Sequence, residues 1–471
     1  MKWVKRFSLN QLPVHGSNVQ SGYTQFTAKL LHLKTNHIMN KFITTLAFTS
    51  TLLATPLVSN GQNVKLPEGK EIYIPKELQQ NDFYNPESKW SFHRMVTTPN
   101  FVVFWEKGFG DDLSKAPDLE GHNMKVDMKN LLEKLESFYA YYRDTLKFVL
   151  PGSKSERYRM MVMLNYSLEG TAYGGDYDQQ IGALWIAPNR VQDKKLNCIA
   201  HELGHSFQSQ VGCDGQGESW GGGGIFEMTS QWMLWQVNPE WVTDEHYHWE
   251  GFKQHINLPF LHGENIYHSP YVLEYWGMKR GLTVMGDLFR HGRRGEDPTM
   301  TYMRLFGLSL DDMADEMYDC YSRLITFDFP RVKESHKKYA CELKTDYIHT
   351  DTEFAPMPEK APYTYGFNVL ELPVENGKSI KISFEGTGDK NKDGYRYGIV
   401  ATDADGNAQY SKVCSAFKGK LTYKPEKGTE KMFLVVVGYP KDQYQPIVGN
   451  PYEQKGKEEA RMFNYKVKIE K

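Results

Sequence analysis

The sequence predicts an α+β fold, in which a mixed sheet packs against helices, followed by a C-terminal β-sandwich. Three observations carry this prediction. Apolar segments of strand and helix length alternate from residue 101 to the helical stretch that begins at Leu196, helical spacing dominates residues 263–329, and short β-rich runs follow Pro362. The chain has 471 residues, 40% of them hydrophobic and 24% charged, which is globular composition and enough length for two or three domains.

The first half of the α+β region alternates strands with helices. Runs of apolar residues predict strands at 101–105, 159–164 and 182–187. Between the first two strands, apolar residues recur at helical spacing over 126–146, and helical spacing returns at Leu196. The order strand, helix, strand, strand, helix predicts one mixed sheet with helices packed on it.

The second half of the chain changes from helical to β-type patterning. After a helical stretch at 263–329, short apolar runs are separated by Gly, Asn and Asp, which is typical of a β-sandwich. These runs lie at 365–372, 379–384, 397–402, 420–423, 432–438 and 463–469. We therefore predict an irregular lead-in at 60–95, an α+β domain at 96–357 and a sandwich domain at 358–471.

Residues 1–59 have the features of an N-terminal extension and signal peptide. Residues 1–67 contain no Asp or Glu, and Lys41 precedes an apolar run over 42–58 that ends near small residues. Because signal peptides begin at the initiating methionine, we interpret Met39 as the true start. We expect a secreted, periplasmic or cell-surface protein. No stretch of the remaining chain approaches the roughly 20 apolar residues of a membrane span, so we expect no transmembrane anchor in the mature chain.

Charge and cysteine content exclude several classes of protein. Lys and Arg total 56 and Asp and Glu 58, a net charge of −2, so nothing indicates a nucleic-acid partner. The five cysteines are too few for a disulfide scaffold and show no CxxC spacing, which argues against a thiolate zinc site. Cys320 and Cys341 are the pair that could form one bridge in an oxidising compartment.

The sequence His201-Glu202-Leu203-Gly204-His205 is the strongest chemical signal in the chain. On a helix, residues four apart share one face, so both imidazoles can reach a single ion while Glu202 lies beside them. The flanking apolar residues supply that helix. Two solvated or capped helix histidines are the structural alternative.

A catalytic zinc also needs a third protein ligand. Glu227 lies 22 residues after His205 and opens a second helical run beyond a glycine-rich loop, so it is the predicted third ligand. The alternatives are Glu218, His246 and His248. In one other class of zinc site, the third ligand is a histidine six residues after the second one, which would be position 211. That position holds Val211, so this class is excluded.

This arrangement resembles the gluzincin class of zinc metallopeptidases, in which a glutamate from the next helix joins HExxH. The resemblance covers roughly residues 95–330 and implies a zincin-like catalytic domain, with His201, His205 and Glu227 as Zn²⁺ ligands and Glu202 as general base. Two positions depart from better-known members: Phe226 stands where many have Asn, and Gln231 where some have an acid that orients a ligand histidine.

The resemblance also implies a substrate groove. In this class an edge strand before the first metal helix pairs with the extended substrate, and 182–187 occupy that place here, with Trp185 shaping a pocket. An ordinary edge strand is the alternative. Tyr267, His268 and Tyr271 open a downstream helix that packs over the active site in this class, and Tyr271 is the predicted donor to the developing oxyanion. For each of these residues, the alternative is an aromatic side chain in packing or a surface residue.

The sequence as a whole predicts a secreted zinc metallopeptidase that hydrolyses peptide bonds. The expected substrate is a protein or peptide, with a glycoprotein as an alternative, and the sandwich is expected to bind glycan or protein. A glycan- or surface-binding protein with a degenerate or structural zinc site is the other candidate. The intact motif favours an enzyme, because a structural site would not need Glu202.

Overall fold

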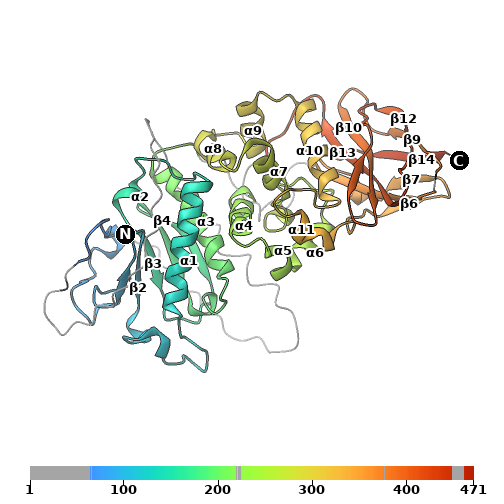
Figure 1. Ribbon diagram of the computed structural model, residues 1–471. Coiled ribbons are helices and arrows are strands. Elements are labelled where there is room, and N and C mark those ends of the chain that lie inside the picture. Colours follow the sequence, from blue (N-terminus) through green and yellow to red (C-terminus); the bar gives the residue numbers. More distant parts are fainter. Residues whose placement is uncertain are drawn as a thin grey trace, which may run out of the picture. The chain divides into compact units, whose positions relative to one another are not determined.

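The computed structural model describes residues 64, 66–218, 220, 224–375, 377–447 and 461–470. The predicted extension and signal peptide at 1–59, with its start at Met39, lie outside the described residues, and so does part of the glycine-rich loop. The predicted α+β fold class is confirmed. A mixed sheet with helices is followed by a helical region and then by antiparallel sheets that form a sandwich (Figure 1).

The first sheet is mixed and has the strand order β1-β2-β3-β5-β4. Its strands are β1 (Met95–Thr97), β2 (Phe101–Trp105), β3 (Met160–Leu164), β4 (Ala172–Tyr177) and β5 (Ile181–Ile186). The three central strands are parallel, and β1 and β4 are antiparallel to their neighbours. Every residue of β2 and β3 is buried, as expected for strands covered on both faces.

Two helices, α1 (Met128–Ala140) and α3 (Asn197–Cys213), lie side by side in this part of the fold (Figure 1). Helix α1 continues into a π-helical turn at Tyr141–Thr145, so the segment predicted as one helix changes its hydrogen bonding near the end. Tyr142 in this turn donates a hydrogen bond to the carbonyl oxygen of Ala200 at 2.9 Å, and its ring packs edge-on against Phe207. These contacts fix α3 against the end of α1 at Ala200, the residue that precedes the histidine motif.

The prediction that residues 182–187 form an edge strand is wrong. Strand β5 lies between β3 and β4, and β4 is the edge strand of the sheet. The hairpin between β4 and β5 turns through Asp178 and Gln179, both with positive φ. Strand β4 has the sequence Ala-Tyr-Gly-Gly-Asp-Tyr, and its two glycines and aspartate are poor strand formers, so the segment has the composition of a loop.

The middle of the chain is helical, as predicted. Its helices are α4 (Gly224–Val237), α5 (Trp241–Asp244), α6 (Tyr247–Gln254), α7 (Tyr271–Arg280), α8 (Val284–His291), α9 (Pro298–Phe306), α10 (Leu310–Leu324) and α11 (Lys333–His336), whereas the short helix α2 (Lys154–Arg157) precedes β3. Among the described residues, none of the helices combines the length and the apolar character that crossing a membrane requires.

The C-terminal strands form two antiparallel sheets. The first has the order β11-β10-β13-β8 and the second β12-β9-β14-β7-β6. The strands are β6 (Tyr347–His349), β7 (Glu353–Pro356), β8 (Phe367–Leu372), β9 (Ile380–Gly386), β10 (Asp393–Asp403), β11 (Ala408–Tyr410), β12 (Lys418–Tyr423), β13 (Thr429–Pro440) and β14 (Tyr465–Glu470). The second sheet thus includes two strands that precede residue 358.

Strand β13 is buried on both faces and belongs to two hydrophobic cores. Phe433, Val435 and Val437 belong to the main core, which also contains buried residues of α10, whereas Leu434 and Val436 belong to the core between the two C-terminal sheets. Side chains alternate between the faces of a strand, so this one segment is part of both cores.

All five cysteines are free, so the bridge considered between Cys320 and Cys341 does not form. The thiol of Cys320 is buried in α10 and contacts the carbonyl oxygen of Tyr271.

Candidate metal centre

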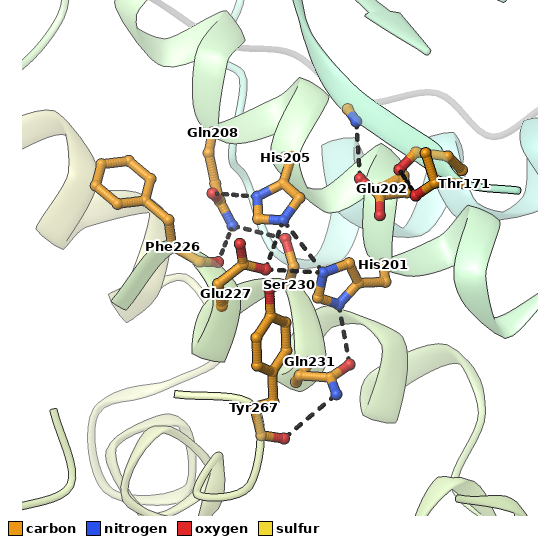
Figure 2. Close-up of polar contacts among 12 residues, drawn as sticks. Thr171, His201, Glu202, His205, Gln208, Phe226, Glu227, Ser230, Gln231 and Tyr267 are labelled. Carbon is orange, nitrogen blue, oxygen red and sulfur yellow. Dashed lines mark hydrogen bonds and ion pairs between the residues drawn. The ribbon is translucent and has the colours of Figure 1, made fainter. Parts of the chain in front are cut away.

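Two helices bring three candidate metal ligands together. His201 and His205 lie one turn apart on α3, and Glu227 lies in the first turn of α4, which packs against α3. The Nε2 atoms of the two histidines are 3.1 Å apart. Oε2 of Glu227 lies 3.2 Å from Nε2 of His201 and 3.0 Å from Nε2 of His205 (Figure 2). The three side chains therefore converge on one point.

Gly204, inside the histidine motif, allows α4 to approach α3 this closely. A Cβ atom at this position would lie 2.8 Å from Oγ of Ser230 and 3.2 Å from its Cα. Because Ser230 lies on α4 one turn after Glu227, a larger residue at 204 would push the two helices apart. The glycine thus helps to place the carboxylate beside the two imidazoles.

The geometry of this group fits a tetrahedral metal ion. Zinc binds imidazole nitrogen and carboxylate oxygen at about 2.0–2.2 Å, so two such ligands at tetrahedral angles are separated by about 3.3 Å. The three separations of 3.0–3.2 Å are slightly shorter than this value. His201, His205 and Glu227 can therefore hold a metal ion with little movement, and three protein ligands leave one position open.

The electrostatics of the group favour a bound cation. The side chain of Glu227 is only 7% exposed. Burial raises the pKa of its carboxyl, but His205 and His201 outweigh this effect and lower the pKa well below its usual range. Burial lowers the pKa of His205, but Glu227 outweighs this and raises it to about 9. The buried carboxylate thus favours positive charge at the point where the three side chains converge, which is where a metal ion would supply it.

Glu202 lies beside the group and contacts the edge strand. Its Oε2 accepts a hydrogen bond of 2.8 Å from the backbone N–H of Gly174 on β4. Burial raises the pKa of this carboxyl, and the negative charge of Glu227 adds to the shift, while the two histidines oppose it. A raised pKa is the property that lets a carboxylate exchange protons near neutral pH.

The other ring nitrogen of each histidine faces a glutamine. Nδ1 of His201 lies 2.9 Å from Oε1 of Gln231, and Nδ1 of His205 lies 3.1 Å from Oε1 of Gln208 (Figure 2). The sequence analysis noted only that Gln231 stands where some gluzincins have an acid that orients a ligand histidine, and it gave no role to Gln208. Their spacing was a usable signal, because Gln208 follows His205 by one turn on α3 and Gln231 follows Glu227 by one turn on α4.

The structure brings Tyr267, rather than Tyr271, to the metal ligands. The ring of Tyr267 stacks on that of His201, with centroids 6.1 Å apart, and Figure 2 shows its phenol end pointing towards Glu227. Tyr271 is fully buried among aromatic side chains, including Trp235 and Phe252. The hydroxyl of Tyr271 has no hydrogen-bond partner among the described residues.

The alternative third ligands are engaged elsewhere. Glu218 accepts a hydrogen bond from the backbone N–H of Arg294, and His246 pairs with Glu250. His248 is 3.0 Å from Nε2 of Gln231, and its other nitrogen is 2.8 Å from Nδ1 of His268, so it is one residue removed from the metal ligands. Within the described part of the chain, only Glu227 joins the two motif histidines in a metal-type group.

The chain matches the model of a protein family. This family is described as a family of unknown function, DUF6055, and it matches residues 64–471. No curated protein matches the chain.

Comparison with solved structures gives distant similarities. One is the ZmpB metallopeptidase from Clostridium perfringens, at 18% identity and a TM-score of 0.29, covering 75% of this chain and 67% of that one. Another is the M60 catalytic domain with the CBM51-1 and CBM51-2 domains of ZmpB from the same organism. It has 16% identity and a TM-score of 0.30, and the match covers 75% of this chain and 36% of that one.

Proposed function

The chain belongs to the DUF6055 family, whose function is unknown, and we propose that it is a zinc metallopeptidase that hydrolyses peptide bonds in proteins or peptides. One observation carries the proposal. His201 and His205 from α3 and Glu227 from α4 place three ligand atoms 3.0–3.2 Å apart, with Glu202 of the same motif beside them. A structural site would need the ligands but not the adjacent acid.

Zinc and Glu202 have separate roles in the proposed reaction. Zinc, when bound, supplies Lewis acidity that polarises the scissile carbonyl and makes water acidic enough to attack near neutral pH. Glu202 acts as general base and takes the proton from the attacking water, then delivers it to the leaving amine. Burial of this carboxyl raises its pKa and so favours the protonated form, which the group must adopt between the two transfers.

Strand β4 is the part of the fold that we propose to bind the peptide. It is the outer strand of the first sheet and lies next to α3, and Gly174 within it contacts Glu202. An extended peptide can add to a strand edge through backbone hydrogen bonds, which require no particular side chains. Strand β4 thus takes the role of the substrate-pairing edge strand, which was expected for residues 182–187.

We further propose that the protein is exported and matures by cleavage near residue 59. The apolar run at 42–58 after Lys41, and the lack of acidic residues in 1–67, support this proposal. N-terminal sequencing of the protein recovered from the medium or periplasm tests it. A mature protein that retains residues 1–38 would contradict both the cleavage and the start at Met39.

The enzymatic proposal is tested with Glu202→Gln. We expect this variant to bind zinc as the wild type does, measured by metal analysis, and to lose hydrolysis of casein and of mucin, because the amide cannot accept the water's proton. Removing zinc from the wild type with a chelator should also stop hydrolysis, and adding zinc back should restore it. Comparing the two substrates separates an ordinary protein substrate from a glycoprotein.

The matched control is Glu218→Gln, which also replaces an acid by its amide. Glu218 contacts the backbone of Arg294 and lies outside the metal group, so this variant should keep its activity. Wild-type turnover in Glu202→Gln, or hydrolysis that survives complete removal of metal, would show that the proposed mechanism is wrong.

A further inference from the structure

Two buried glutamines make equivalent contacts with the two ligand histidines. Gln208 on α3 and Gln231 on α4 are 5% and 3% exposed. Each places its Oε1 atom against the Nδ1 atom of one histidine, at 3.1 Å for His205 and 2.9 Å for His201. The ring nitrogens on the other side, the two Nε2 atoms, are those that converge with Glu227.

The orientation of each amide group is fixed by a backbone carbonyl. Nε2 of Gln208 donates to the carbonyl oxygen of Phe226 at 2.9 Å, and Nε2 of Gln231 donates to that of Tyr267 at 3.3 Å. A carbonyl oxygen can only accept a hydrogen bond, so the NH₂ end of each amide must face it. The oxygen end of each amide is then left facing the imidazole.

This orientation determines which ring nitrogen of each histidine carries the proton. An amide oxygen is an acceptor, so the Nδ1 atom that faces it must be protonated. A neutral imidazole with a proton on Nδ1 has its lone pair on Nε2, which is the atom that faces the metal group. The backbone carbonyls of Phe226 and Tyr267 thus determine, through the two glutamines, which ring nitrogen of His205 and of His201 carries the proton.

We propose that Gln208 and Gln231 are positioning residues that hold His205 and His201 in the metal-binding tautomer and ring orientation. This inference rests on the proposed metal centre and adds to it the side chains that prepare the ligands. Neither glutamine contacts the candidate ligand atoms, so each acts through its histidine.

The same contacts explain why these positions hold amides rather than acids. A glutamate at 208 or 231 could accept from Nδ1, but its second oxygen would face the carbonyl oxygen of Phe226 or Tyr267, where two acceptors repel. The amides satisfy both neighbours and carry no charge. Among the described residues, Glu227 is then the one acidic side chain that is hydrogen-bonded to the two ligand histidines.

The test compares four glutamine variants of the full chain. Gln208→Met and Gln231→Met remove the amide while keeping an unbranched side chain of similar length. The matched controls are Gln210→Met on α3 and Gln236→Met on α4, both buried. Gln210 forms hydrogen bonds with Asp214 and with the backbone N–H of Gly182, and Gln236 forms one with Glu274. All four changes remove a buried amide, but only the first two affect a ligand histidine.

The first measurement is zinc affinity, by competition with a chelator. We expect about 10- to 100-fold weaker binding in Gln208→Met and Gln231→Met than in the wild type, the usual effect of losing a group that orients a metal ligand. The controls should bind zinc as tightly as the wild type. Equal affinity in all four variants would overturn the inference and leave the proposed peptidase intact.

The second measurement reports the tautomer directly and does not depend on how the variants fold. NMR of zinc-loaded wild type labelled with ¹⁵N-histidine should show two histidines with a proton on Nδ1 and none on Nε2. A proton on Nε2 in either ligand would overturn the inference. Wild type that binds zinc in this way without cleaving casein or mucin would contradict the proposed function alone, and wild type that binds no zinc would contradict both.

Discussion

Among single residues, Tyr267 and Tyr271 lie close in sequence but in different surroundings. Tyr267 stacks on His201, and its backbone carbonyl accepts from Gln231, so it is part of the candidate metal centre. Tyr271 is packed against Trp235, Trp249 and Phe252 and is fully buried. A donor to a developing oxyanion must reach the reacting carbonyl, and only Tyr267 lies against a ligand.

We predict that Tyr267→Phe lowers kcat by roughly 100-fold, the usual cost of removing one oxyanion donor, with little change in zinc affinity. Tyr271→Phe is the matched control. It removes a hydroxyl that has no hydrogen-bond partner among the described residues, so activity should remain close to wild type. Steady-state kinetics on a peptide substrate measure both. A larger loss of kcat in Tyr271→Phe would restore that residue as the donor.

The motif histidines could be identified from the sequence, but the sequence could not show whether Tyr267 or Tyr271 is the donor to the oxyanion. His201 and His205 are related by helical spacing within one element, and Glu227 by its place in the next helix, so local pattern is sufficient. The position of Tyr267 depends on how the turn before α7 packs against α3 and α4, and no local pattern encodes that packing. The one-turn spacing of Gln208 from His205 and of Gln231 from Glu227 was a usable signal, but it does not show which glutamine contacts which histidine, because that depends on how α3 and α4 pack together.

Among the elements, the contact between α3 and β4 determines the geometry beside Glu202. The backbone of Gly174 lies so close to α3 that a Cβ atom would be 1.7 Å from the carbonyl oxygen of Glu202 and 2.8 Å from Cβ of His205. Its N–H also holds the carboxylate of Glu202. A side chain at this position would have to displace the helix that carries the metal ligands.

We predict that Gly174→Ala destabilises the protein by roughly 3 kcal/mol or more, at the upper end of the cost of overpacking, and weakens zinc binding. Gly175→Ala is the matched control on the same strand. A Cβ there would meet only the ring of Trp185, at the ordinary contact distance of 3.5 Å. Chemical denaturation monitored by circular dichroism gives the free energy of unfolding. Equal stability of the two variants would mean that β4 does not pack on α3 in this way.

The sheet shows which elements the sequence could predict. Strands β2, β3 and β5 are continuous apolar runs, which buried parallel strands require, and all three were predicted. Strand β4 was missed because Gly174 and Gly175 weaken the pattern and because its pairing is created by the hairpin turn at Asp178 and Gln179. The edge position was therefore assigned to the wrong strand.

On the scale of the whole molecule, the helical region and the first C-terminal sheet share one hydrophobic core. Phe367 on β8 stacks on Tyr321 of α10 with ring centroids 4.0 Å apart, and Tyr321 donates a hydrogen bond to the carbonyl oxygen of Tyr365. Arg396 on β10 is buried and binds Asp311 and Asp315 of α10. A domain boundary near residue 358 is visible in the sequence pattern, but the shared core depends on residues far apart in the chain.

We predict that a chain ending at residue 357 does not fold into a stable unit. The truncation would expose the core side chains of α10 that β13, β10 and Phe367 of β8 cover, and a large exposed apolar face favours aggregation. The full chain should unfold in one cooperative transition by calorimetry, whereas the truncated chain should lack a transition and bind a hydrophobic dye. A truncated chain with its own sharp transition would show that the sandwich is dispensable for stability.

The outer edge of β4 also has a consequence for solubility. Among the described residues no strand pairs with this edge, and an open edge is a template on which copies of a protein can join into larger assemblies. The same strand contains Gly174, Gly175 and Asp176, residue types that disfavour such joining. The two glycines and the aspartate that made β4 hard to recognise in the sequence thus also disfavour self-association through its open edge.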